Sequence, residues 1–445
     1  MAIVIKAART GGLRAMLSIE TAPYYLYFLL LCMPGLARIG DISLSIVIFP
    51  AIIFGYGKAA LQFLKKVLPG ARSLLFTLLV VIGIYSVWSL ITAFGVPSFL
   101  RVFRPLYGHA SGVGLVVAVF ALSRTRRSGE QTRNLTMTLF CIVLCVSLFA
   151  GNGSYGDRMP GFFKHPNQLG VVVAMASIYF LCCALASGFR SMPFNAGALI
   201  SLAGLFVSGS KTNLVAVGGL ALVAVILLAR LKRNPRLAML GVFRDYAVVG
   251  VLVALAIPIL AIVNVRASTV LGSIFGGDEE IGEYGTVLAR QDLWAESWET
   301  FKASPLFGAG AGQRFPSIVE HSHNIFFDAL RTTGFPGFVL ILTFIVIILR
   351  YIVSAMSAGR QLAAIPTSPM SDPQSRGPFV GSLMAMLSYL LSNQMSDSFG
   401  PSTLPFFYLF LGLSTFFVCR NVPDERILQL NGSVAPKHTQ QRYVL

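Results

Sequence analysis

The sequence has few charged residues. Only 12% of its 445 residues are Asp, Glu, Lys or Arg, whereas soluble globular chains carry about 25%. Hydrophobic residues make up 55% of the chain, and its mean hydropathy is +0.73. So low a charge content excludes an ordinary soluble domain, and long apolar runs in such number are typical of polytopic membrane proteins.

Cysteine is scarce as well, with six in the chain. All of them lie in or at the end of apolar segments, where they suit small packing residues: Cys32, Cys141, Cys145, Cys182, Cys183 and Cys419. The polar insert at 265–333 contains none, so the sequence predicts no disulfide framework there.

Acidic residues are outnumbered by basic ones, 18 against 35, which gives a net charge of +17. Such a charge could indicate a nucleic-acid partner, but its distribution favours a membrane instead. With the N-terminus placed inside, roughly two-thirds of the Lys and Arg residues fall in inner loops and tails, which is the positive-inside pattern. The pattern predicts both termini in the cytoplasm and the 265–333 insert on the outer side of the membrane.

The hydropathy pattern predicts an all-α polytopic fold with about 12 transmembrane helices. We expect them near 21–37, 42–56, 73–94, 106–122, 134–151, 167–187, 194–208, 213–229, 245–264, 334–355, 378–392 and 403–419. The predicted organisation is helices 1–9 over 1–264, a large helical periplasmic loop over 265–333, helices 10–12 over 334–419 and a cytoplasmic tail over 420–445.

The insert begins with an acidic, Gly-rich stretch and continues as a predicted helix from Thr286. The acidic residues Asp278, Glu279, Glu280 and Glu283 lack the ligand spacing of a calcium loop, so we expect a solvated loop and no metal site. In the helix, Trp294, Trp298 and Phe301 share a sector with Arg290, while the carboxylates take the opposite side.

Arg290 therefore lies on the predicted inward face of that helix without an acidic partner on its stripe. A bound anion would satisfy the guanidinium there. The alternative is a guanidinium stacked on Trp294, one turn away. Pro305 should end the helix, and Gly308, Gly310 and Gly312 then form either a backbone approach to a ligand or a turn.

Two outer connections place cations at the starts of predicted helices. In the loop 151–170, Arg158, Lys164 and His165 precede Pro166 and Asn167, which open the sixth helix, so an anion could bind at its free N–H groups. In the turn 207–214, Lys211 is surrounded by hydroxyl and amide side chains, including that of Ser210. Solvated charges in the loop and a lysine that snorkels to the surface in the turn are the alternatives.

The segment His321-Ser322-His323-Asn324 precedes the tenth predicted helix. On a helix, His323, Phe327 and Leu330 would share one face, and this pattern is also that of a buried core histidine. Histidines at i and i+2 point apart on a helix, so the pair has no known zinc spacing.

These residues resemble a known pattern. His323-Asn324, nine residues and then Gly334-Phe335-Pro336-Gly337 resemble the His-Asn-x9-Gly-x-x-Gly signature of the O-antigen ligase and polysaccharide polymerase superfamily. Three further features resemble that family: the run Arg290, Trp294, Pro305, Gly308, Gly310, the His165-x-Asn167 entry to helix six, and the large loop between helices nine and ten.

The resemblance implies a GT-C-like glycosyltransferase that works by inversion without a metal or cofactor. The donor would be a glycan on undecaprenyl pyrophosphate, and the acceptor a sugar hydroxyl on a lipid-linked or lipid A-core glycan. His323 would act on the acceptor hydroxyl, and Arg290 and Lys211 on the pyrophosphate, with Lys211 standing where the family usually has Arg. The implied substrate-binding residues are Asn324, His321, His165, Asn167, Arg158, Lys164, Arg314 and Ser210.

Three classes of function remain open on the sequence alone: a glycan polymerase or ligase, a transporter and a structural scaffold. The turn at Lys211 favours a polymerase of an exported polysaccharide over an O-antigen ligase, with a flippase and a chain-length regulator as candidate partners. A lipid-linked oligosaccharide transporter would need charges at mid-membrane depth or internal repeats, and the apolar segments are almost free of charge. A structural scaffold would not need the clustered basic and histidine residues of the outer loops.

Overall fold

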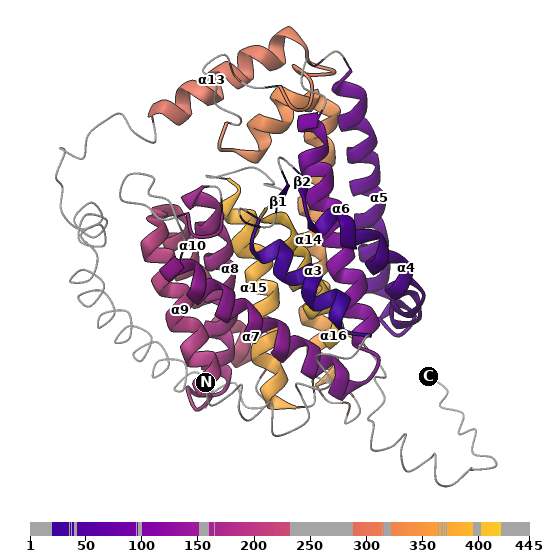
Figure 1. The fold of residues 1–445 in the computed structure, drawn as a ribbon, viewed down its shortest axis with the longest axis vertical. Helices are drawn as coiled ribbons and strands as arrows, with labels where there is room; N and C mark the ends of the chain where they lie inside the picture. Colours follow the sequence, from indigo (N-terminus) through magenta and orange to yellow (C-terminus); the bar gives the residue numbers. More distant parts are fainter. Residues whose placement is uncertain are drawn as a thin grey trace, which may run out of the picture.

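The computed structural model is a bundle of helices, and one further helix, near the end of the bundle, lies across it (Figure 1). It describes residues 20–34, 36, 38–39, 42–94, 96, 100–150, 160–163, 165–231, 288–313, 315, 322–363, 365, 368, 370, 372–394 and 402–419. The helices are α3 (Ala22–Cys32), α4 (Ser45–Leu64), α5 (Pro69–Thr92), α6 (Leu100–Leu122), α7 (Arg126–Ala150), α8 (Pro166–Ala186), α9 (Met192–Ser208), α10 (Lys211–Arg230), α13 (Leu288–Ala303), α14 (Ile325–Leu362), α15 (Arg376–Ser392) and α16 (Leu404–Phe417). A short 3-10 turn, Pro373–Ser375, precedes α15, and Arg38–Ile39 (β1) pairs antiparallel with Ile42–Ser43 (β2).

The predicted all-α membrane fold is confirmed. Six of the described helices are long and apolar enough to cross a membrane, and four shorter apolar helices accompany them. The first eight predicted segments coincide with α3 to α10 and the last three with α14 to α16. The ninth, at 245–264, lies outside the described residues.

The helix α8 forms the centre of the bundle. It is apolar on all sides and almost entirely buried inside the protein. A helix that is apolar all round is expected in such a place, where other helices surround it. The helix α8 packs against α9, α10 and α15. Gly377 and Gly381 let α15 approach α8 closely, because a Cβ at either position would lie 2.8 Å from an atom of the α8 backbone.

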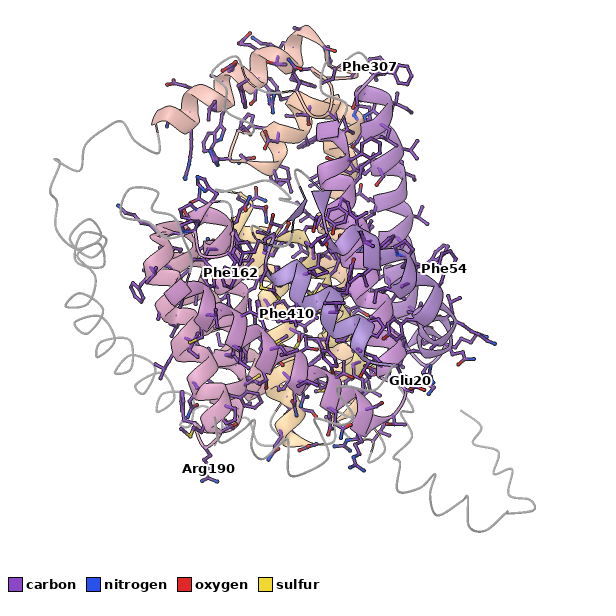
Figure 2. All side chains as sticks on the ribbon, viewed as in Figure 1. Glu20, Phe54, Phe162, Arg190, Phe307 and Phe410 are labelled. Atoms are coloured by element: carbon purple, nitrogen blue, oxygen red, sulfur yellow. The ribbon has the colours of Figure 1, made fainter. Side chains whose placement is uncertain are left out.

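The two ends of the bundle differ. Phe307, in the turn after α13, and Arg190, in the connection from α8 to α9, mark opposite ends of the molecule (Figure 2). We call the end marked by Phe307 the α13 end. The starts of α8 and α10 and the end of α15 approach it, because α8 runs toward Arg190 and α9 returns from there.

The helix α14 extends beyond the bundle into the α13 end. Its residues from Phe335 to Leu362 alone give a length of about 42 Å, above the ~30 Å of a bilayer core. The backbone breaks at Gly334, where φ is 67° and ψ is −166°, and the N–H of Phe335 there donates to the carbonyl of Pro305 at 2.8 Å. The first nine residues of α14 are therefore set at an angle to the long apolar part and belong with α13.

Candidate functional site

The helix α13 is held on the start of α14 by Trp294. Its indole lies parallel to the Phe327 ring, with centroids 5.6 Å apart and an interplanar angle of 9°. Its Nε1–H donates to the carbonyl oxygen of Ser322 at 3.0 Å. Trp294 thus packs inward, as the helical pattern predicts, but the same prediction is wrong for Trp298, which is 45% exposed. The contact places α13 directly beside the residue that precedes His323.

His323 does not lie on a helix, which corrects the expectation that it shares a helical face with Phe327 and Leu330. Its backbone is left-handed, with φ of 56°, and α14 starts two residues later. The reason is Asn324, which caps the helix in an extended conformation: its Oδ1 accepts the N–H groups of Phe326 at 2.9 Å and Phe327 at 3.3 Å. The half-buried imidazole is therefore carried by a turn.

The same cap joins α14 to the end of α15. The Nδ2 of Asn324 donates to the carbonyl of Gln394 at 3.3 Å, and the N–H of Ile325 donates to the carbonyl of Asn393 at 3.2 Å. A helix N-terminus and a helix C-terminus thus meet through backbone groups that would otherwise lack helical partners. The position of His323 is set relative to α15 by these two bonds.

The end of α15 is joined in turn to the start of α10. Ser392 donates from Oγ to Oδ1 of Asn213 at 2.5 Å, and both side chains are fully buried. Asn213 lies two residues after Lys211, which is the first residue of α10 and is exposed. The tight turn before it depends on Gly209, which has φ of 63°. A hydrogen-bonded path therefore runs from Asn213 through the end of α15 to Asn324, and Lys211 and His323 lie close in the chain to its two ends.

The start of α8 packs on this path. A Cβ on Gly170 would lie 2.9 Å from both Nδ2 of Asn213 and Cβ of Ser210, so only glycine lets α8 approach the turn so closely. His165 caps α8, its Nδ1 accepting the N–H of Asn167 at 3.2 Å. The expectation that Pro166 opens this helix, with Asn167 in its first turn, is confirmed.

Arg290 lies in the first turn of α13 and is half-buried. Burial lowers the pKa of Arg290, but a guanidinium remains protonated near neutral pH. Within the part of the chain that the structure describes, Arg290 has neither an ion pair nor a stack on Trp294. A half-buried cation of this kind is suited to an anionic ligand.

The Gly-rich turn after α13 packs against the protein itself. Gly308, Gly310 and Gly312 all have positive φ, between 65° and 95°. A Cβ on Gly308 would lie 2.4 Å from the carbonyl oxygen of Arg331, and one on Gly310 would lie 2.7 Å from that of Thr92. These glycines therefore serve the turn, one of the two alternatives that the sequence leaves open, by letting it approach α14 and α5.

Of the predicted site residues, the structure places His323 and Asn324 on one turn, and Ser210 and Lys211 on another. His165 and Asn167 lie at the start of the helix that packs on the second turn, and Arg290 lies on the helix that covers the first. His321, Arg158, Lys164 and Arg314 lie outside the described residues. No cluster of three or more His, Cys, Asp or Glu side chains suited to a metal occurs among the residues described.

Sequence reasoning missed several residues that hold this arrangement. Asp328 and Arg331 form a buried pair in the first turns of α14, and Ser392 and Asn213 connect α15 with α10. The charges at 328 and 331 in an otherwise apolar run were a usable signal. The contact between 213 and 392 joins positions 179 residues apart, and the sequence offers no sign of it.

The fold and this arrangement define a polytopic membrane protein in which Lys211, Arg290 and His323 lie at the α13 end of an apolar helical bundle. A family model described as O-antigen ligase matches residues 196–342, which contain Lys211, Arg290 and His323. The match supports the resemblance to the O-antigen ligase and polymerase superfamily that the motifs predict. It also supports a membrane enzyme of that type, for which the family implies lipid-linked glycan substrates. No curated protein matches the chain.

Proposed function

We propose that the protein is an inverting glycosyltransferase that moves a glycan from undecaprenyl pyrophosphate to a sugar hydroxyl of a lipid-linked acceptor. The observation that carries the proposal is the hydrogen-bonded path from α10 through the end of α15 to the cap of α14. It holds a cation, Lys211, and a histidine, His323, at the same end of the bundle in a fixed relation. A transfer from a phosphate leaving group needs these two functions together.

His323 is proposed as the base for the acceptor. The acceptor oxygen attacks the anomeric carbon of the donor sugar, the bond from that carbon to the pyrophosphate oxygen breaks, and the hydroxyl proton passes to the imidazole. Attack on the face opposite the leaving group inverts the anomeric centre. A neutral imidazole accepts a proton near neutral pH, and a half-buried place at the edge of the bundle suits a lipid-linked sugar.

Arg290 and Lys211 are proposed to bind the pyrophosphate. The leaving group carries several negative charges, and cations already in position stabilise the charge that develops on it. Arg290 can offer two parallel N–H donors, whereas Lys211 acts as a point charge. The three residues would activate the acceptor hydroxyl and stabilise the pyrophosphate leaving group without a metal ion, so we propose a metal-independent reaction.

We further propose that the product is an exported polysaccharide, built by repeated transfer at the periplasmic face of the inner membrane. The distribution of Lys and Arg supports this orientation, with both termini in the cytoplasm. The acceptor would then be a second lipid-linked glycan. A flippase that supplies the donor and a regulator of chain length are the partners that such a polymerase would need.

The test is a transfer assay with purified protein and an undecaprenyl-pyrophosphate-linked oligosaccharide. A polymerase yields a ladder of products, a ligase yields a single transfer when lipid A-core is added, and a transporter yields no new glycosidic bond. His323→Ala should accumulate in the membrane at native levels, still bind the donor and lose about 10² to 10⁴ in rate, as expected for a general base. Loss of folded protein, instead of loss of transfer alone, would favour the core-histidine alternative.

A further inference from the structure

The start of α14 contains a buried ion pair between Asp328 and Arg331. Nη2 of Arg331 lies 3.6 Å from Oδ1 of Asp328, and the two residues are only 2% and 8% exposed. Neither side chain belongs to the motifs that define the proposed reaction. Burying two charges requires that both receive further partners, and those partners, Gln313, Phe315 and Ser322, all precede His323 in the chain.

Asp328 holds the residue before His323. Its Oδ1 accepts the backbone N–H of Ser322 at 2.7 Å, while the carbonyl oxygen of Ser322 accepts the indole N–H of Trp294. The Oγ of Ser322 donates to the carbonyl of Asn324 at 3.0 Å. Both backbone groups and the side chain of Ser322 are therefore fixed, directly before the left-handed His323.

Arg331 connects the ion pair to the segment that follows α13. Its Nη1 donates to the carbonyl of Gln313 at 2.9 Å, and its guanidinium lies 4.0 Å from the ring centre of Phe315. Its backbone carbonyl accepts the N–H of Ala309 at 2.6 Å. The carboxylate that holds Ser322 is thereby fixed to the Gly-rich turn as well as to α14.

We propose that Asp328 and Arg331 are positioning residues for His323, an inference that rests on the proposed function. A histidine in the left-handed region is disfavoured and relaxes unless its neighbours hold it. Releasing Ser322 would let the imidazole move relative to the acceptor hydroxyl. A displacement of about 1 Å at a reacting group can lower a rate by about 10².

Two neutral double variants separate the hydrogen bond from the charges. Asp328→Asn with Arg331→Gln keeps a carbonyl oxygen for the Ser322 N–H, whereas Asp328→Ala with Arg331→Gln removes it. Neither leaves a buried charge alone, so both can fold. We expect the Asn form to keep kcat within about tenfold of native and the Ala form to lose about 10² in kcat, with little change in KM.

Hydrogen exchange supplies a measurement that does not depend on transfer. The amide of Ser322 should exchange faster in the Ala form than in the Asn form. Glu299→Ala serves as the matched control, because it breaks an ion pair with Lys302 on α13 that is exposed and touches no part of this arrangement. It should leave both kcat and the exchange at Ser322 unchanged.

The two proposals fail in different ways. If His323→Ala keeps its activity, the proposed function of His323 is wrong. If His323→Ala is inactive but the folded Ala double variant transfers glycan at the native rate, His323 is the base and the positioning role is wrong. Equal losses of kcat in the Asn and Ala forms would also overturn the positioning role, because the bond to Ser322 would then not matter.

Discussion

Arg290 gives the sharpest test at the scale of single residues. It is half-buried and has no acidic partner among the described residues, so its removal should harm ligand binding more than folding. Arg290→Ala should lower transfer by about 10² or more while membrane insertion stays normal, and Arg290→Lys should fall between it and the native protein because the two-pronged donor is lost. The rate of transfer and the amount of folded protein in the membrane measure this.

The matched control for Arg290 is Lys302→Ala. Lys302 is in the last turn of the same helix, and its ion pair with Glu299 is exposed, so the change should leave the rate within about twofold of native. Native activity in the Arg290→Ala protein would remove Arg290 from the donor site.

Lys211 is expected to act through its charge alone. Lys211→Arg should keep or raise activity, because the cation is retained and two parallel donors are gained. Lys211→Glu should abolish it, because a carboxylate at that point repels a pyrophosphate. Transfer rates and retention of the lipid donor by purified protein check both changes. Normal product from the Glu form would leave Lys211 as a boundary residue only.

At the scale of helices, the contact between α15 and α8 is expected to be intolerant of bulk. Gly381→Leu would force side-chain atoms into the α8 backbone at Tyr179, which should cost about 1–3 kcal/mol. Gly219→Leu on α10 is the control, because a Cβ there meets nothing within 4 Å. Thermal unfolding in detergent should be lowered by the first change and not by the second. Equal melting temperatures would show that the helices can separate without loss.

The helices themselves could be predicted because hydropathy alone decides where a chain crosses a membrane. The start of α8 at Pro166 and that of α10 at Lys211 could be predicted from local signals. The place of His323 could not, since an N-cap by Asn324 and a continuous helix differ only in backbone angles. The bond between Ser392 and Asn213 arises from the packing of α15 against α10, which no local pattern in one sequence encodes.

For the whole molecule, the charge distribution predicts which end faces out. All six cysteines lie in apolar segments, so a variant with alanine at each can carry a single new thiol. An impermeant maleimide should label Glu299→Cys in intact cells and should label Arg190→Cys only after permeabilisation, because the two sites lie at opposite ends of the bundle. The reverse result would invert the proposed orientation and remove the site from the periplasm.

The left-handed backbone of His323 is expected to lower the stability of the fold. Glycine adopts such a φ without the steric penalty that other residues meet, so glycine at this position would relieve the backbone strain. His323→Gly should therefore melt at a higher temperature than His323→Ala and be equally inactive. Such a result would mean that the imidazole of His323 is held at a cost in folding free energy, as strained residues at functional sites often are.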